Sequence, residues 1–125
     1  ALQIFGNDFD TPDGTAIRDY VHVNDLATAH VNAMTYLENG GASDAFNLGT
    51  GNGTSIKDIL DTVKRLSGKE VPHAIATRSP GDVPALYASA ERAKQHLNWS
   101  PTQSSLDNII KTALNWHQHH RTGND

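Results

Sequence analysis

The chain contains no cysteine, a single methionine and no long apolar run. The missing thiols exclude disulfides, cysteine nucleophiles and cysteine-ligated metals. No segment is apolar over the length needed to cross a bilayer, and no secretory leader opens the chain, so we expect no membrane partner. Cytoplasm is the expected location.

Charge is also sparse. Charged residues make up 19% of the 125 residues, the net charge is -4, and no run of Lys or Arg occurs. Binding to nucleic acid needs a basic patch, so the composition predicts no nucleic-acid partner. A small anionic ligand is compatible with this composition because it needs only a few local cations. The length suits one modest domain.

Short apolar runs alternate with amphipathic segments along the chain. This alternation predicts an α/β fold, with mixed α+β character because the strands are short and few. About four helices are expected. We predict strands at residues 2–6, 16–23, 45–49 and 71–76, and helices at about 24–37, 55–67, 90–97 and from 104 or 105 onward.

Polar residues at the starts of these helices predict their caps. Asn24 or Asp25 is expected to cap the first helix. Ser55 and Asp58 have the Ser-x-x-acid spacing of a capping box at the start of the second. Ser89 is expected to cap the third helix.

A glycine-rich segment, GTGNG at residues 49–53, lies between an expected strand and an expected helix. Dinucleotide-binding loops occupy this context, where glycines let a pyrophosphate approach the helix N-terminus. The spacing departs from that fingerprint because its third glycine falls on Thr54. The preceding strand contains Asn47 and is not fully apolar. A tight turn is therefore the favoured interpretation, and phosphate binding is the alternative.

The sequence gives little support for a catalytic or a metal-binding site. His117 and His120 could share a helical face at ligand spacing, but no carboxylate accompanies them, so we expect no metal site in this terminal segment, which we predict to fray. His22 is interpreted as a hydrogen-bonded structural histidine. Gly-x-Ser-x-Gly is absent. Asp13 and Asp19 are expected to belong to turns, so no catalytic residue is predicted.

Two arginines lie where they could hold an anion. Arg18 follows a glycine-containing turn at the entrance of an expected strand, and Arg78 lies in the loop TRSPGD. A guanidinium presents a rigid fork of donors that matches two phosphate oxygens, so two arginines on separate loops could clamp a diphosphate. The alternative pairs Arg18 with Asp19 or another nearby acid and leaves Arg78 in water. The chemistry alone favours this alternative.

Longer motifs connect these segments to a known family. The stretch IFGNDFDTPDGTAIRDYVHVNDLATAH closely resembles the UDP-glucose 4-epimerases of the extended short-chain dehydrogenase/reductase family. Their pattern here is an apolar strand ending in Phe-Gly, an Asp-Gly-Thr turn, and Arg-Asp-Tyr-[Ile/Val]-His-Val-x-Asp-Leu-Ala. The stretches FNLGTGNGTS, GDVPALYA and NWSPTQSSLDNIIKTALNWH also resemble that family, so the resemblance runs the whole length.

The resemblance implies an NAD-dependent isomerase that interconverts UDP-glucose and UDP-galactose through a 4-keto intermediate. In that family, NAD lies in an N-terminal Rossmann domain and the base belongs to a Tyr-x-x-x-Lys motif. This chain has neither the Gly-x-x-Gly-x-x-Gly fingerprint nor that motif. The resemblance therefore implies that residues 1–125 are a single C-terminal, UDP-sugar-binding portion that lacks the NAD-binding core. We expect it to bind no NAD and to be inactive alone.

Site residues can be carried over where the motifs match. Arg18 matches the arginine that contacts the diphosphate in the family. Gln3, Ile4 and Phe5 match the residues before Phe-Gly that line the uridine. The family's Arg-x-Gly-Asp loop supplies a second phosphate arginine and a ribose-binding aspartate, and Asp82 matches the aspartate.

The chain departs from the family pattern at two substrate positions. Ser79 stands where the motif has its arginine, and Arg78 is one residue too early. Losing such a charge-assisted contact would cost on the order of 1.5–3 kcal/mol, so weaker UDP binding is expected unless Arg78 compensates. Leu86 stands where some relatives carry a tyrosine that narrows the hexose pocket. The smaller leucine leads us to expect that N-acetylated sugars fit.

Partners and alternatives follow from the same resemblance. It implies that the helix at 25–37 and the strand at 45–49 pack onto an NAD-binding sheet. The expected partners are a UDP-sugar and an N-terminal Rossmann domain, or a second copy through the exposed interface. The alternative is a non-enzymatic nucleotide-binding or self-associating remnant of a truncated epimerase gene. A related dehydratase is a third possibility, but the Asp-Gly-Thr turn favours the epimerase.

Overall fold

The computed structural model describes residues 2–123, with side chains described for residues 2–118. It confirms the predicted mixed α/β class, with four helices and short strands among these residues. The elements, in chain order, are β1 (Leu2–Phe5), β2 (Ile17–Arg18), α1 (Val23–Glu38), β3 (Thr54–Ser55), α2 (Ile56–Ser67), β4 (His73–Ala76), β5 (Ala85–Leu86), α3 (Glu91–Leu97) and α4 (Leu106–Gly123).

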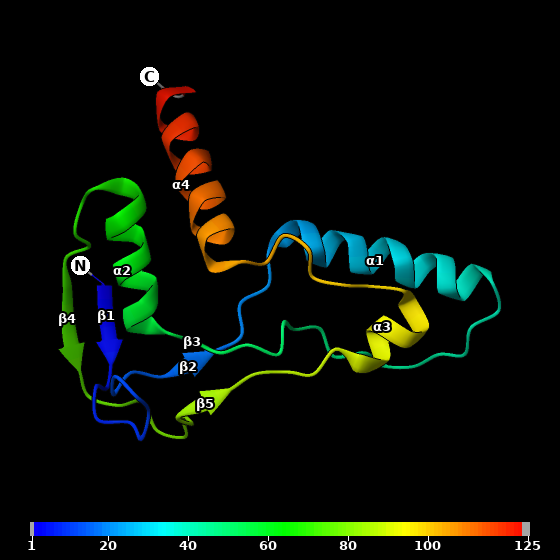
Figure 1. Cartoon of the computed structure of the whole chain (residues 1–125), viewed down its shortest axis with the longest axis horizontal. Coiled ribbons are helices and arrows are strands. Elements are labelled where there is room, and N and C mark those ends of the chain that lie inside the picture. Colours follow the sequence, from blue (N-terminus) through cyan, green and yellow to red (C-terminus); the bar gives the residue numbers. More distant parts are fainter. Residues whose placement is uncertain (1, 124–125) are drawn as a thin grey trace.

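The strands form two small sheets that lie near one end of the molecule (Figure 1). In one sheet β1 pairs in parallel with β4, and Phe5 lies opposite Ala76. In the other sheet β2 is central, antiparallel to β3 and parallel to β5. Arg18 lies opposite Thr54 on one side and opposite Leu86 on the other.

Two loops connect the sheets in the same direction. Residues 6–16 lead from the end of β1 into β2, and residues 77–84 lead from the end of β4 into β5. Because β1 pairs with β4 and β2 pairs with β5, these loops start together and end together. We call them the paired connections. Figure 1 shows them at the lower left of the molecule.

The turn in the first connection explains its glycine. Gly14 has φ +82°, and a Cβ there would lie 2.2 Å from the backbone oxygen of Asn7. Only a residue without a side chain fits that approach. Asp13 accepts hydrogen bonds from the Thr15 amide and hydroxyl, and its other oxygen accepts from the Ser55 hydroxyl at 2.5 Å. The Asp-Gly-Thr turn is thereby joined to the start of α2.

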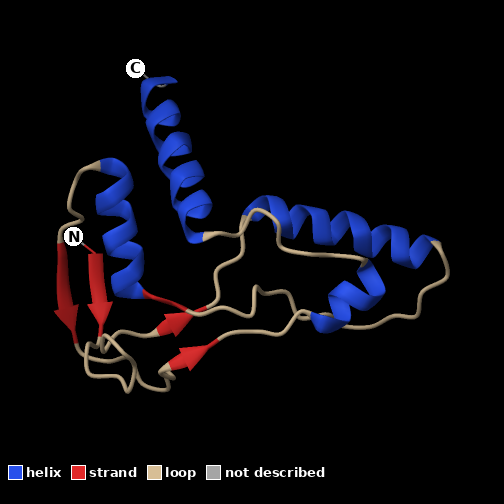
Figure 2. Ribbon diagram, viewed as in Figure 1, coloured by secondary structure: helices blue, strands red, loops and turns tan. Residues whose placement is uncertain are grey.

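The helices form two pairs at opposite ends of the molecule (Figure 2). α2 packs against α4 beside the β1–β4 sheet, and α1 packs against α3. No helix among residues 2–123 is both long enough and apolar enough to cross a membrane.

The buried core lies between α1 and α3. Its largest member is Trp99, which is fully buried, and its indole Nε1 donates to the backbone oxygen of Asp25 at 2.8 Å. Smaller apolar residues, Ala29, Ala93 and Leu97, surround it. Partly buried side chains, among them Tyr36 and Phe46, pack against this cluster from outside.

Two of the three predicted caps were wrong. His22, not Asn24 or Asp25, caps α1, and its Nδ1 accepts from the Asn24 amide. The Asp25 carboxylate instead reaches across to accept from Gln103 and Ser104, far along the chain. The cap of α3 is Ala90, which has no side-chain hydrogen bond, rather than Ser89. The capping box predicted for α2 is confirmed.

Two predicted strands also differ from the structure. Residues 45–49 form no strand, because none of the described strands lies beside them to complete a ladder. The strand predicted at 16–23 is reduced to Ile17–Arg18, since the chain bends toward α1. The C-terminal segment that we predict to fray is helical as far as Gly123 in the structure.

Candidate functional site

Arg18 lies at the centre of the second sheet, between β3 and β5. Its Nη1 donates to its neighbour's carbonyl, that of Ile17, at 2.7 Å and to the carbonyl of Val83 at 3.0 Å. The side chain therefore crosses from one paired connection to the end of the other. A guanidinium has five N–H donors, so this arrangement leaves others for a ligand.

No ion pair involves Arg18 among the residues that the structure describes. The alternative pairing with Asp19 was wrong, because the Asp19 carboxylate is bonded elsewhere. The positive charge of Arg18 also acts on the nearby Tyr20 hydroxyl. Burial raises the pKa of Tyr20, and the positive charge of Arg18 opposes that rise. An uncompensated, partly buried cation is suited to binding an anion.

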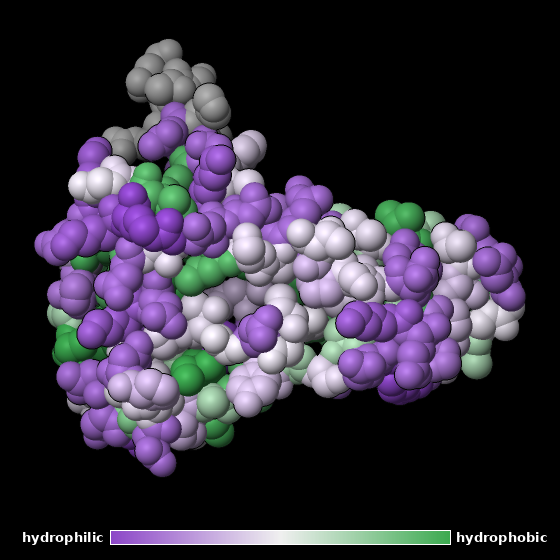
Figure 3. Space-filling view, viewed as in Figure 1, coloured by the Kyte–Doolittle hydropathy of each residue, from purple (hydrophilic) through white to green (hydrophobic). Residues whose placement is uncertain are grey.

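Apolar side chains are exposed on β5, which pairs with β2, and at the end of β1. Phe5 at the end of β1 is 46% exposed, and Leu86 in β5 is 60% exposed. Val83 and Tyr87 flank Leu86 and are also exposed. Figure 3 shows apolar areas at the end that carries the strands, set among polar ones. Such side chains beside a cation can hold the apolar faces of a ligand whose charge the cation binds.

The other predicted site residues lie on β1 and on the second paired connection. Gln3 is exposed and Ile4 is buried, as expected for neighbours on a strand. The Ile4 side chain therefore belongs to the interior, and its carbonyl accepts from the Gly6 amide at 2.9 Å. Asp82 is exposed, and its amide donates to the carbonyl of Ser79 at 3.3 Å across a turn.

Arg78 is not left in water, and its guanidinium does not join Arg18 in a two-arginine clamp. Its Nη2 donates to the backbone and carboxylate oxygens of Asp8 at 3.0 and 3.1 Å. Its guanidinium carbon lies 4.1 Å from the centre of the Phe9 ring. The pairing of Arg78 with Asp8 and Phe9 was not predicted from the sequence. The only signal for them is that Phe9 is an apolar residue in an otherwise polar loop.

The glycine-rich segment at 49–53 is a turn that binds a carboxylate of the chain itself. The amide of Thr50 donates to both Asp19 oxygens at 3.0 and 2.9 Å, and the Gly51 amide donates at 3.0 Å. These amides are the donors that a phosphate would need. Because Asp19 already occupies them, the favoured interpretation as a structural turn agrees with the geometry.

These hydrogen bonds make Asp19 a pH-sensitive anchor. Burial acts to raise the pKa of Asp19, but the bonds from Thr50, Gly51 and Ala88 outweigh it and hold the pKa below 3.8. A lowered folded-state pKa means that the stabilisation is complete above the unfolded-state value and is lost as the pH falls through the folded-state value. We expect Asp19→Asn to lower the free energy of unfolding at pH 7 by roughly 1.5–3 kcal/mol.

Denaturant unfolding between pH 7 and pH 2.5 measures this contribution. The Asp19→Asn variant should lose less stability than the wild type as the pH falls below about 5. Asp10→Asn, at an exposed loop carboxylate, is the matched control and should follow the wild type. Parallel curves for the wild type and Asp19→Asn would contradict the assignment.

His22 has a structural role. Its Nδ1 accepts from the Asn24 amide at 2.9 Å, so the ring proton is on Nε2, which lies 2.8 Å from the Thr112 hydroxyl. The buried imidazole joins α1 to α4, which agrees with its interpretation as a hydrogen-bonded structural histidine. No cluster of three metal-ligating side chains occurs in the described part of the chain. The side chain of His120 lies outside the described residues.

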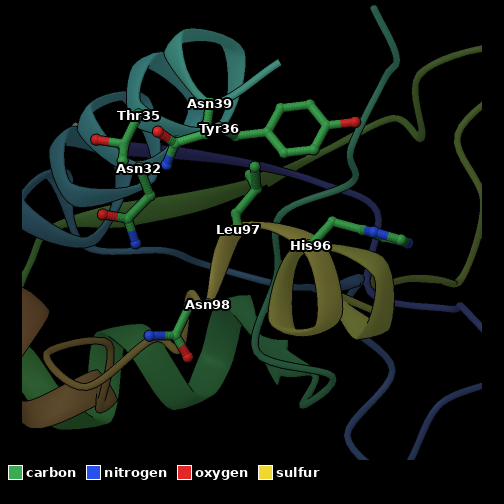
Figure 4. Close-up of a pocket in the computed structure, with 7 residues that line it drawn as sticks. All are labelled: Asn32, Thr35, Tyr36, Asn39, His96, Leu97 and Asn98. Carbon is green, nitrogen blue, oxygen red and sulfur yellow. The ribbon is translucent and has the colours of Figure 1, made fainter. Parts of the chain in front are cut away.

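A separate cavity of about 270 Å³ lies between α1 and α3 (Figure 4). None of the predicted site residues lines it, and it contains no Arg, Lys, Asp or Glu side chain. It therefore has no charged group that would hold a diphosphate. Its lining residues are Asn32, Thr35, Tyr36, Asn39, His96, Leu97 and Asn98.

Comparison with known protein families gives a match over most of the chain. The model of the family described as GDP-mannose 4,6 dehydratase matches residues 5–113. The chain belongs to this family. The matched range includes Arg18, both paired connections and the exposed apolar residues around them.

Individual relatives are UDP-glucose 4-epimerases. The enzyme of Azospirillum brasilense is 50% identical over 115 residues, which are 92% of this chain and 33% of that protein. The structure of the Brucella ovis enzyme in complex with NAD is 50% identical, with a TM-score of 0.84 over 88% of this chain and 34% of that one. The Bifidobacterium longum enzyme in complex with NAD+ and UDP is 37% identical, with a TM-score of 0.83 over 97% and 36%.

The predicted resemblance is therefore confirmed. This family member is homologous to the C-terminal part of the UDP-glucose 4-epimerases. It spans about a third of the length of the curated relatives that it matches.

Proposed function

We propose that the chain is the UDP-sugar-binding C-terminal part of a UDP-glucose 4-epimerase and is inactive by itself. The observation that carries this proposal is the unpaired Arg18 guanidinium in the second sheet. It would bind the diphosphate. Phe5 and Leu86 would contact the uracil and the sugar, and the Asp82 carboxylate would accept from the ribose hydroxyls.

The proposal assigns NAD to the remainder of the enzyme. NAD would supply the redox chemistry of an epimerase, but the residues of this chain do not fit it. The glycine-rich turn at residues 49–53, which precedes β3 and α2, has its Thr50 and Gly51 amides bonded to Asp19. We therefore assign no catalytic step to these residues, and their contribution is to bind and orient the sugar nucleotide.

Two surfaces support an N-terminal domain as the partner. Along α1 the residues Val23, Val31, Met34 and Leu37 are 55–71% exposed. Val23, Ala27, His30, Met34 and Leu37 follow a spacing of four and three, which is typical of a helix that packs against another element. Residues 45–49 pair with none of the described strands. An NAD-binding domain with a sheet and helices would cover both.

Titration of this chain with UDP, followed by two-dimensional amide NMR, tests the binding site. We expect dispersed peaks, with shifts concentrated near Phe5, Arg18 and Asp82. Dispersed peaks that do not respond to UDP would contradict the proposed site and favour a non-binding remnant. Shifts confined to the α1–α3 cavity would place the ligand elsewhere.

Sedimentation velocity tests the partner surface. We expect the chain to self-associate or to bind an N-terminal domain taken from one of the relatives, because the apolar side of α1 is otherwise exposed to water. Met34→Lys should abolish that association. Thr28→Lys, on the polar side of the same helix, is the matched control. A wild-type chain that is monomeric and ignores the N-terminal domain would contradict the proposal.

A further inference from the structure

The paired connections are joined along their length by Arg78. Its guanidinium carbon lies 4.1 Å over the centre of the Phe9 ring, and its Nη2 donates to the backbone oxygen and to one carboxylate oxygen of Asp8, 70 positions away in the sequence. The contact with the ring favours a flat guanidinium, and the same group also pairs with Asp8, so the two contacts together restrict its orientation. A lysine ammonium could reach Asp8 but could not lie flat on the ring.

The backbone around this contact leaves little freedom. Gly6 has φ +101°, and a Cβ there would lie 3.1 Å from the Phe9 ring and 3.2 Å from the Cβ of Arg78. The Gly6 amide donates to the carbonyl of Ala76 at 3.0 Å, and Phe9 is buried. Phe9 is therefore a fixed platform for the guanidinium.

Both ends of the paired connections carry residues of the candidate site. Phe5 immediately precedes the first connection, and Arg18 lies in β2 at its far end. Ser79 and Asp82 lie within the second connection. In the described chain, β1 and β4 share no strand pairing with β2 or β5. The separation between Phe5 and Arg18 is therefore set by the two connections rather than by a continuous sheet.

We propose that Arg78 is a positioning residue that holds the uridine-contacting and diphosphate-contacting parts of the site at a fixed separation. It acts through Phe9 and Asp8 and does not itself bind phosphate. This inference rests on the proposed UDP-sugar function. It also assigns Arg78 a role other than replacing the motif arginine at Ser79.

Isothermal titration of UDP into this chain and its variants tests the proposal. Arg78→Lys and Phe9→Leu should each weaken UDP binding by roughly tenfold. The double variant should bind no more weakly than either single variant, because both substitutions remove the same contact. Additive losses would overturn the proposal. So would loss of binding in Arg78→Lys with unchanged binding in Phe9→Leu, since Arg78 would then contact the phosphate directly.

Arg92 offers a matched control. Its guanidinium lies 5.4 Å from the centre of the Phe46 ring and is paired with Asp44, but it lies on α3, away from the paired connections. Arg92→Lys should lose the same kind of contact and leave UDP affinity unchanged. Equal weakening in Arg78→Lys and Arg92→Lys would overturn the proposal, because loss of stability alone would then explain it.

Amide hydrogen exchange separates this inference from the proposed function. If the wild-type chain binds no UDP, the proposed function fails, but the role of Arg78 in positioning is still measurable. Arg78→Lys should speed exchange at the Gly6 and Asp82 amides by roughly tenfold relative to the wild type, and Arg92→Lys should not. Unchanged exchange at both amides would show that Arg78 does not hold the connections and would overturn the proposal.

Discussion

Replacing Trp99 with alanine is expected to lower the free energy of unfolding by about 3–5 kcal/mol. The side chain is fully buried in a packed cluster, so its removal would leave a cavity that the surrounding side chains fill only in part. The substitution also removes the indole donor to the Asp25 carbonyl. Since small domains are stable by only about 5–15 kcal/mol, this loss would be a large share of the total stability.

Urea unfolding followed by circular dichroism measures this loss, and two variants separate its causes. Trp99→Phe keeps most of the ring and removes the Nε1 donor, so it should lose less than Trp99→Ala. Trp116→Ala removes the same side chain from a position that is 65% exposed on α4. A loss in Trp116→Ala as large as that in Trp99→Ala would contradict the placement of the core.

Replacing Arg18 with alanine is expected to weaken UDP binding by roughly 10- to 100-fold. A hydrogen bond to a charged group contributes about 1.5–3 kcal/mol, and each 1.4 kcal/mol changes affinity about tenfold. No described carboxylate neutralises Arg18, so its full charge is available to the diphosphate. Calorimetric titration of the variant beside the wild type gives the ratio directly.

Uridine distinguishes a phosphate contact from a structural effect of Arg18. Uridine carries no phosphate, so Arg18→Ala should leave its affinity unchanged while weakening UDP. Lys57→Ala, which removes an exposed cation from the start of α2, is the control for net charge and should alter neither affinity. Equal losses for uridine and UDP in Arg18→Ala would show that Arg18 supports the fold rather than the ligand.

Elements set by local chemistry could be predicted from the sequence. The helical periodicity of α1, α2 and α4 and the Ser55–Asp58 capping box depend on residues within a few positions of one another, and the structure contains all of them. The strand at 45–49 was predicted on its apolar residues. A strand also needs a partner, which the described residues do not provide.

The site residues also divide into those set by local sequence and those set by distant partners. The position of Arg18 at a strand entrance follows from the turn that precedes it. The ion pair between Arg78 and Asp8 could not be predicted, because the two residues are 70 positions apart and no local sequence pattern connects them. Likewise, the glycine-rich turn is adjacent in sequence to α2, but the carboxylate that fills it belongs to Asp19, 31 positions before Thr50. Tertiary partners, rather than local propensity, decided both cases.

The parallel pairing of β1 with β4 has a consequence for the order of folding. Leu2 pairs with His73, so the strand that ends at Phe5 gains the one partner it has among the described strands after a loop of roughly 70 residues has closed. Closing a loop of that length costs entropy before any contact compensates, and such non-local pairings slow folding. Helices α1 and α2 can form earlier from local contacts. Phe5, at the end of β1, is therefore fixed in place late in folding. A partly folded chain would have the Arg18 cation before it has the ordered apolar contact of the site.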